Sequence, residues 1–309
     1  MHKKLLIIAI FVISAGSSYG QYNVDYGVSA GLSNYLGEIG GGENTRKDFI
    51  SDMKLNFTRW TFGGFFRYRF ASKLAVKGSL NYIRLTADDA NTLNPGRRAR
   101  NLNFKNDMFE FLVNGELYLF KVNDVGRRGT YGSDFNLYAF TGVGFFYSNP
   151  KGQNTSEEWV SLKPLQTEGV SYSSFNLAIP VGLGFYYTIN RKYRFGLEIG
   201  WRTTFTDYID DISTVYANDY DGISNKTSLA LIDEVNSENG FELGDEGYIV
   251  PTNFDAGSKR GDPTHNDSYM TATVNFSWAI RGRSKFYRSR HSWVLGKNKR
   301  RRRKSRAKF

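Results

Sequence analysis

The sequence predicts an all-β protein, an eight-stranded antiparallel transmembrane β-barrel. Three observations lead to this prediction. Apolar and polar residues alternate with period two through eight segments, and the connections between those segments are alternately long and short. Phe, Tyr and Trp make up 16% of the 309 residues, beside 32 Gly and only 6 Pro. Aromatic residues on one strand face and small or polar residues on the other suit a barrel whose outer wall meets lipid.

Residues 1–20 have the features of a cleavable signal peptide. Two lysines precede an apolar run over residues 5–13, and the small residues Ser18 and Gly20 stand at the −3 and −1 positions of a cleavage site. Beyond this segment no apolar run reaches the roughly 18 residues that suggest a membrane-spanning helix. We therefore expect an exported protein that crosses a membrane, if at all, with strands.

The eight alternating segments follow one after another along the chain. In the first, Val24, Tyr26 and Val28 lie on one face, while Asp25 and Gly27 lie on the other. Every segment has about the 9–11 residues that a tilted strand needs to cross a bilayer. The predicted strands are 24–33, 59–70, 74–82, 109–119, 136–147, 176–187, 194–202 and 271–280.

The connections alternate in length, which gives the barrel an orientation. Long loops face the outside and short turns face the periplasm in barrels of this class, so both termini are expected in the periplasm. A soluble β-sandwich also alternates, but it has no reason to place a loop of about twenty residues at every second connection. The predicted connections are 39–56, 71–73, 87–104, 122–134, 149–172, 190–192 and 206–267.

A barrel of eight strands is narrow, and side chains fill its interior. Charged residues of both signs fall on the polar faces of the predicted strands. We expect them to pair across the lumen and close it, which favours a scaffold over a channel. The inward charged residues are Arg59, Arg67, Arg69, Lys77, Glu110, Glu116, Glu198 and Arg202.

The net charge of +11 belongs to the C-terminal segment. Residues 281–309 hold 14 Lys or Arg and no Asp or Glu, and the signal peptide adds two lysines, which leaves −5 for residues 21–280. The chain thus divides into the signal peptide 1–20, a mildly acidic barrel over 21–281 and a basic periplasmic tail over 282–309.

The tail is the candidate partner-binding segment, because aromatic and aliphatic residues precede its run of cations. Behind a signal peptide no nucleic acid is expected as its partner. Anionic lipid headgroups and an acidic protein face are the two candidates, and a solvated tail is the alternative. The candidate binding residues are Trp293, Arg300, Arg301, Arg302, Arg303 and Lys304.

Residues that could carry catalysis are sparse. The chain has no Cys, and its three histidines are His2, His265 and His291, none on a predicted strand. We therefore expect no enzyme and no cofactor, although a lipid-modifying enzyme remains a rival. The loop 206–267 has 14 Asp or Glu, among them Asp207, Asp210 and Asp211. These carboxylates would suit Ca²⁺, but the spacing is not that of an EF-hand, and a solvated acidic loop is the favoured interpretation.

Four stretches of the sequence resemble the PorG-type outer-membrane barrels of Bacteroidota. They are residues 26–41 (YGVSAGLSNYLGEIGG), 63–85 (GGFFRYRFASKLAVKGSLNYIRL), 98–120 (RARNLNFKNDMFEFLVNGELYLF) and 138–152 (YAFTGVGFFYSNPKG). The likeness is greatest where the first strand ends, in Asn34 to Glu38, and at Arg100 to Phe104. Beyond this first half the similarity is mainly one of strand pattern.

The resemblance implies a non-enzymatic component of the type IX protein secretion system, which in gliding species also supports motility. It implies that the barrel associates with a periplasmic ring of a PorK-type lipoprotein and a PorN-type partner, and ties that ring to the outer membrane. Outer-membrane lipid and lipopolysaccharide are the other expected partners. The alternative is a small porin or ligand-binding barrel of the OmpW or OmpX kind.

Overall fold

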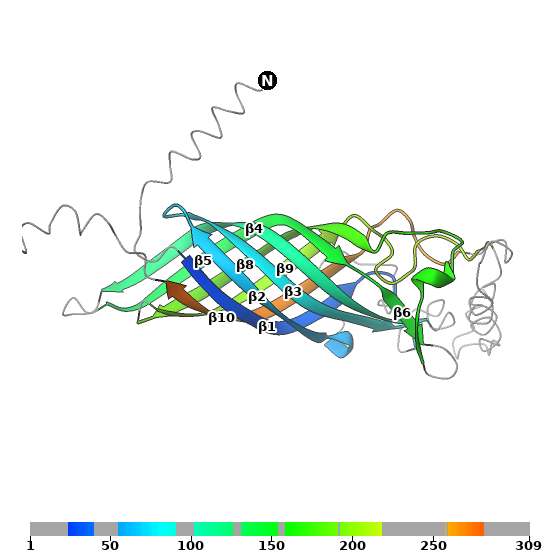
Figure 1. Ribbon diagram of the computed structural model, residues 1–309, viewed down its shortest axis with the longest axis horizontal. Coiled ribbons are helices and arrows are strands. Elements are labelled where there is room, and N and C mark those ends of the chain that lie inside the picture. Colours follow the sequence, from blue (N-terminus) through cyan, green and yellow to red (C-terminus); the bar gives the residue numbers. More distant parts are fainter. Residues whose placement is uncertain are drawn as a thin grey trace, which may run out of the picture.

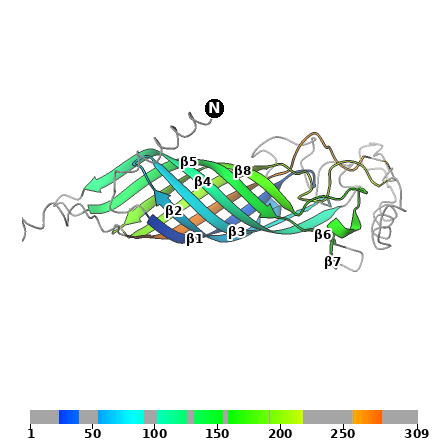
Figure 2. The same ribbon diagram turned by 45° about the horizontal axis from the view of Figure 1, so that its top comes forward.

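The computed structural model describes residues 24–39, 55–90, 102–125, 131–153, 158–190, 192–217, 257 and 259–280. They form a long barrel whose strands run obliquely around a common axis (Figures 1 and 2). The eight barrel strands are β1 (Val24–Leu36), β2 (Arg59–Arg69), β3 (Leu74–Asp88), β4 (Asn103–Val125), β5 (Tyr131–Tyr147), β8 (Phe175–Ile189), β9 (Tyr193–Thr204) and β10 (Ser268–Ile280).

Each barrel strand pairs antiparallel with the next one along the chain, from β1 to β5 and then through β8, β9 and β10. The barrel is closed by β10 against β1, where Val24 lies opposite Ile280 and Leu36 opposite Ser268. The predicted eight-stranded antiparallel barrel is therefore confirmed. Closure leaves no barrel strand with an unpaired edge along its full length.

The two ends of the barrel differ. Short connections at 70–73 and 190–192 lie at the end where β1 begins and β10 finishes, which we call the turn end. The four long connections, 37–58, 89–102, 148–174 and 205–267, lie at the opposite loop end. The predicted alternation of long and short connections is thus confirmed.

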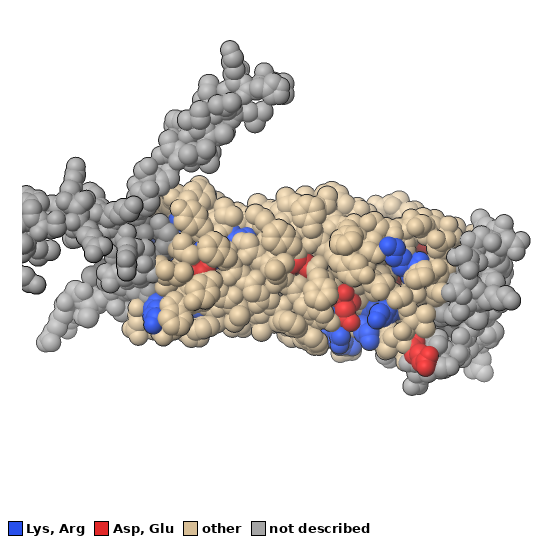
Figure 3. All heavy atoms as spheres, in the orientation of Figure 1, with Lys and Arg blue, Asp and Glu red and all other residues tan. Residues whose placement is uncertain are grey.

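The outer wall is apolar through the middle of the barrel. Figure 3 shows most of this wall without Lys, Arg, Asp or Glu, apart from a few small patches, and the largest group of charged side chains lies toward the loop end. The alternation of the sequence causes this, because successive residues of a strand point to opposite faces. Exposed apolar side chains include Val28, Phe66, Leu80, Phe111, Val143, Val181, Leu183, Ile199 and Val274. No helix among the described residues is long and apolar enough to cross a membrane.

Glycines on the inner face make room for two aromatic rings. A Cβ atom added to Gly184 of β8 would lie 2.6 Å from the hydroxyl oxygen of Tyr138 on β5. One added to Gly182 would lie 2.5 Å from Cζ of Phe140. Tyr138 and Phe140 can therefore lie across the lumen only because β8 carries glycines opposite them.

The structure extends the predicted strands and adds elements to the loops. β4 spans Asn103–Val125, longer than the predicted 109–119, because its ladder with β3 continues to Asp88 opposite Asn103. The fifth connection contains a short hairpin, β6 (Pro150–Gln153) and β7 (Trp159–Ser161), which pairs with β4 through β6. Two single 3-10 turns, η3 (Leu55–Phe57) and η4 (Lys163–Leu165), lie in other parts of the loops. None of these four short elements is predicted, since each is too short to show a period.

Candidate functional site

The lumen near the turn end is crossed by the guanidinium of Arg67, from β2. Its Nε donates to Glu116 Oε1 at 2.9 Å, and its Nη atoms lie 3.3 Å from Asp25 Oδ2 and 3.3 Å from Glu198 Oε1. These three carboxylates come from β4, β1 and β9, so one buried side chain joins four strands. Arg67 is 2% exposed. A guanidinium with five donors is suited to this arrangement, because it can serve several carboxylates at once.

Two further cations complete the charge balance around Arg67. Lys77 Nζ lies 2.6 Å from both carboxylate oxygens of Glu198, and Arg194 pairs with Asp25. Asp25 also accepts a hydrogen bond from Ser277 Oγ at 2.9 Å. We call the set Asp25, Arg67, Lys77, Glu116, Tyr138, Arg194 and Glu198 the inner network. Its three cations and three carboxylates have no net formal charge, which is the condition for burying ions at acceptable cost.

Tyrosine hydroxyl groups fill the space beside the inner network. Tyr138 donates to Glu198 and accepts from Arg67 Nη2 at 3.1 Å, while Tyr118 donates to Glu116 at 2.9 Å. Arg69 lies 3.9 Å from the centre of the Tyr118 ring and hydrogen-bonds to the hydroxyl group of Tyr186. Aromatic rings and ion pairs together occupy the lumen at this level.

A second group of charged residues lies closer to the loop end. Arg202 Nε is 3.3 Å from Glu110 Oε1, which also accepts from the Tyr269 hydroxyl at 2.6 Å. Asn81 donates to the other oxygen of Glu110 at 3.0 Å. This group ties β9, β4, β10 and β3 together across the lumen.

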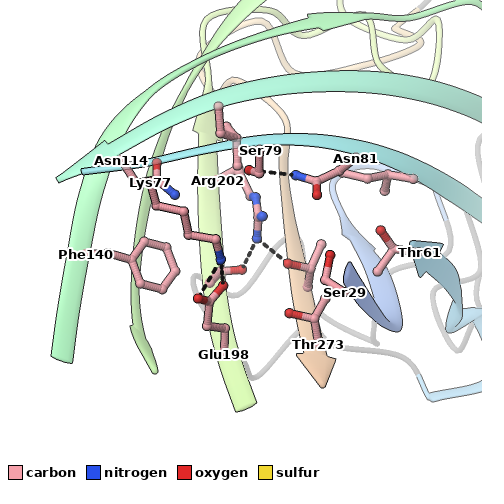
Figure 4. A pocket seen from close by; sticks show the side chains of 14 residues that line it. Ser29, Thr61, Lys77, Ser79, Asn81, Asn114, Phe140, Glu198, Arg202 and Thr273 are labelled. Carbon is pink, nitrogen blue, oxygen red and sulfur yellow. Dashed lines mark hydrogen bonds and ion pairs between the residues drawn. The ribbon is translucent and has the colours of Figure 1, made fainter. Parts of the chain in front are cut away.

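A small polar cavity lies between these two levels (Figure 4). The Lys77 ammonium points to Glu198 on one side of it, and Arg202 reaches Thr271 on another. Its free volume of about 20 Å³ has room for little more than one water molecule. The lining residues are Ser29, Thr61, Lys77, Ser79, Asn81, Ile83, Leu112, Asn114, Phe140, Glu198, Gly200, Arg202, Thr271 and Thr273.

The loop end of the lumen is filled by residues 205–217, which follow β9. Ile209 and Ile212 are fully buried in an apolar cluster with Tyr35, Phe104 and Tyr269. The backbone of Ile209 is held from both sides: its N–H donates to Asp267 at 2.9 Å, and its carbonyl accepts from Asn106 at 2.7 Å. We call residues 205–217, with the segments 259–267 and 167–172 that hold them, the loop cap.

A buried ion-pair group fastens the loop cap. Arg260 lies 3.2 Å from Glu168 and 3.3 Å from Asp211, and Glu168 accepts from the backbone N–H groups of Ser213 and Thr214 at 2.9 and 3.0 Å. Burial alone would lower the pKa of Arg260, but the carboxylates of Asp211 and Glu168 outweigh it and raise that pKa. Burial raises the pKa of Asp211, against the opposing effect of Arg260. Three separate loop segments are joined by this group.

Asp267 is the carboxyl group at the base of the loop cap. It is fully buried and accepts a hydrogen bond from the Tyr35 hydroxyl at 2.6 Å. Burial raises the pKa of Asp267 well above its ordinary value, and the nearby charges of Asp210 and Asp207 raise it further. The base of the cap is therefore a place where a proton stabilises the closed arrangement.

Together these groups fill the lumen at two levels. The side chains of the inner network bind one another rather than converge on a free reacting position. Among the described residues no group of three or more His, Asp or Glu is arranged to hold a metal ion. The described interior is a core of buried ion pairs whose inner network is charge-balanced.

Comparison with known proteins gives the family. The model of the family described as "Domain of unknown function (DUF6089)" matches residues 3–226, well over half of the chain. The chain belongs to the DUF6089 family. No curated protein is significantly similar to it.

Three solved structures are similar to this DUF6089 barrel at low sequence identity. The N-terminal β-barrel domain of Pseudomonas aeruginosa OprF is 8% identical, with a TM-score of 0.35, over 85% of this chain and 100% of that one. OprG of the same organism is 12% identical, with a TM-score of 0.36, over 85% and 99% of the two chains. Ail of Yersinia pestis, in complex with the heparin analogue sucrose octasulfate, is 8% identical, with a TM-score of 0.33, over 83% and 98%.

The inward charges predicted for the DUF6089 barrel are largely confirmed. Six of them pair across the lumen, and Arg69 reaches it beside Tyr118. Arg59 is the exception, because it lies at the rim and donates to the carbonyls of Asn56 and Thr58. Two members of the inner network, Asp25 and Arg194, are not among the predicted residues. The six paired residues are Arg67, Lys77, Glu110, Glu116, Glu198 and Arg202.

The interpretation of the acidic loop as solvated is wrong for its first part. Asp207, Asp210 and Asp211 are buried, because this stretch turns back into the barrel with Ile209 and Ile212. His265 is exposed, as expected for a loop histidine, beside Asp262 at 3.7 Å. The candidate binding residues of the tail lie outside the described residues, as do His2 and His291. They are Trp293, Arg300, Arg301, Arg302, Arg303 and Lys304.

Proposed function

We propose that this barrel is a non-enzymatic scaffold of the type IX protein secretion system, which anchors a periplasmic ring to the outer membrane. One observation carries the proposal: the lumen is filled at two levels, by the inner network around Arg67 and by the loop cap around Ile209. A barrel filled in this way is better suited to be a scaffold than a channel. Its function is then to bind other components at its two ends.

The outer membrane is the location that best suits the outer wall. Exposed apolar and aromatic side chains encircle the barrel, and only lipid covers such a surface without cost. Trp60 near the loop end and Trp278 near the turn end are at the levels where interfacial aromatic residues are expected. The signal peptide predicted over residues 1–20 supports export to that membrane.

The role in secretion rests on the resemblance of residues 26–41, 63–85, 98–120 and 138–152 to PorG-type barrels. A family member of that kind associates with a ring of PorK-type and PorN-type subunits. We assign the turn end to the periplasm, since the long connections lie at the other end. The basic tail, residues 282–309, then begins on the periplasmic side and can reach an acidic face of the ring.

The test is co-purification of the ring with a tagged full-length barrel from its native membrane. A variant with Arg300 to Lys304 replaced by Gln, in a separate strain, should recover much less of the ring subunits. A matched control replaces the cations Arg97, Arg98 and Arg100, in a connection assigned to the outside, and should recover the ring as the wild type does. Heat-modifiable migration on gels checks that each barrel is folded.

Failure to recover any ring subunit with the wild-type barrel would overturn the anchoring role. Equal recovery of the ring with all variants would show that the tail has no part in the anchoring.

The polar cavity beside Lys77 is the one observation that favours the alternative of a small porin or ligand-binding barrel. Conductance measurements separate that alternative from a scaffold. A lipid-modifying activity would appear as altered lipid A in mass spectra of a deletion strain.

A further inference from the structure

Two lysines face each other on the outer wall at the loop end. Lys105 of β4 lies directly opposite Lys151 of β6 in an antiparallel ladder. Directly opposed side chains of such a pair share one face of the sheet, and like charges there destabilise the pairing. The ladder thus holds two adjacent positive charges that an anion from outside the chain would stabilise.

Aromatic rings frame these lysines. Lys105 Nζ lies 4.4 Å from the centre of the Trp159 ring, on the neighbouring strand β7. Farther round the wall, the guanidinium of Arg84 lies 5.1 Å from the centre of the Trp60 ring. We call Arg84, Lys105, Lys151, Trp60 and Trp159 the basic-aromatic patch.

Of the three cations in the patch, Arg84 is the one that has an ion-pair partner among the described residues. Asp107 is its acidic neighbour, and Arg84 Nε already binds Asp107 at 2.5 Å, with the Tyr82 hydroxyl donating to the same oxygen at 2.7 Å. Asp88 and Glu158 lie farther along the strands toward the loops, and Asp88 accepts from the backbone of Ala90 at 2.8 Å. Among the described residues, neither Lys105 nor Lys151 therefore has a carboxylate within ion-pair distance.

The basic-aromatic patch lies directly beyond the apolar part of the outer wall, on the side of the loop end. On β4 the outward residues change from Phe109 and Phe111 to Asp107 and Lys105 within two steps of the alternation. In Figure 3 most of the charged spheres on the wall lie toward this end. A barrel seated by its apolar wall places the patch at the level of lipid headgroups, where cations and aromatic rings meet phosphates.

We propose that the basic-aromatic patch binds the phosphorylated sugar headgroup of an outer-leaflet glycolipid of the lipid A kind. The two opposed lysines bind a phosphate, and the indole of Trp159 beside Lys105 packs against a sugar ring. The proposal rests on the outer-membrane orientation given above, which turns the loop end toward that leaflet. It gives the barrel a fixed lipid neighbour at one side of its wall.

The test compares thermal unfolding of the purified full-length barrel in micelles with and without diphosphoryl lipid A. A ligand that binds the folded state raises the melting temperature. The variant is Lys105→Gln with Lys151→Gln, and the matched control is Lys73→Gln with Lys192→Gln, which removes two exposed lysines at the turn end. Dephosphorylated lipid A and phosphatidylglycerol are the comparison lipids.

We expect lipid A to raise the melting temperature of the wild type and of the control, and to bind the Lys105/Lys151 variant about tenfold more weakly. Without lipid, that variant should be at least as stable as the wild type, because the repulsion between the two lysines is gone. An equal lipid A effect on the variant, or an equal effect of either comparison lipid on the wild type, would overturn the proposal. Because no ring subunit is present, failure here leaves the anchoring role untouched.

Discussion

Arg67 Nε donates to Glu116 Oε1 at 2.9 Å across the lumen, although β2 and β4 are not neighbours in the barrel. The strand between them, β3, contributes Lys77 to the same group through Glu198. The contact of Arg67 with Glu198 of β9, at 3.3 Å, requires more, because β2 and β9 come close only when β10 pairs with β1 and closes the barrel. The inner network therefore reports directly on barrel closure, and it makes the closed barrel more rigid than its ladders alone.

The first prediction concerns Arg67. Arg67→Ala leaves Asp25, Glu116 and Glu198 buried around a missing cation, and should lower the free energy of unfolding by about 3–5 kcal/mol. The control is Arg84→Ala, which breaks the half-exposed ion pair with Asp107 and should cost about 1 kcal/mol or less. Denaturant unfolding of both variants in the same lipid vesicles measures the difference. Equal losses would show that the inner network contributes no more than a surface pair.

The second prediction concerns the glycine beneath Tyr138. Gly184→Ala places a Cβ atom 2.6 Å from the Tyr138 hydroxyl and 2.7 Å from Cγ of Glu198, so the inner network must shift. Stability should fall by about 1–3 kcal/mol. Gly78→Ala is the control, since a Cβ atom there meets nothing within 4 Å. The same unfolding assay applies, and an unchanged Gly184→Ala barrel would mean that Tyr138 moves freely.

The third prediction concerns the fastening of the loop cap. Arg260→Ala leaves Glu168 and Asp211 buried without their shared cation, so the cap should open more often while the barrel stays folded. Hydrogen exchange should become faster at residues 206–217 and stay unchanged in β4 and β5. Lys259→Ala, which removes the exposed neighbouring cation, should leave both regions as in the wild type. Faster exchange throughout the barrel would contradict a locally held cap.

The fourth prediction is a pH dependence of the loop cap. Burial and the charges of Asp210 and Asp207 raise the pKa of Asp267 above its value in the opened chain, so the protonated form favours closure. This stabilisation is complete below the ordinary aspartate pKa of about 4, and it is lost as the pH rises through the raised value. Burial acts on Asp211 in the same direction. Asp262 accepts hydrogen bonds from Thr264, which lower its pKa, so its effect on the pH dependence has the opposite sign. Its side chain is exposed, unlike those of Asp267 and Asp211.

Hydrogen exchange at residues 206–217, corrected for the intrinsic effect of pH, measures this dependence. Opening should increase with pH in the wild type. Asp267→Asn, which is neutral at every pH, should lose most of the change. An opening free energy that rises with pH in the wild type would reverse the assigned sign.

The regular part of the barrel could be predicted from the sequence because lipid outside and polar groups inside impose a strict period of two. In β8, the apolar Leu183 and Phe185 face outward and Gly184 between them faces the lumen, so residue type alone predicts the face of each. The ends of β4 are different. Lys105 and Asp107 face outward but are polar, so the alternation gives no sign that the strand continues there.

The interior pairings and the loop cap could not be predicted for a different reason. Asp25 and Arg194 lie on polar faces, yet they pair only because the closed barrel brings β1 and β9 to the same lumen. Ile209 and Ile212 are two apolar residues in an acidic stretch without a regular period. Their burial depends on Arg260, about fifty residues away, which neutralises the adjacent carboxylate of Asp211.

The measurement that most directly tests the closed scaffold is single-channel conductance of the purified full-length barrel in a planar lipid bilayer. Both the wild type and Arg260→Ala should insert without stepwise current, because the inner network still fills the lumen when the cap is loosened. Steady, reproducible conductance steps from the wild-type barrel would contradict the account and favour a porin.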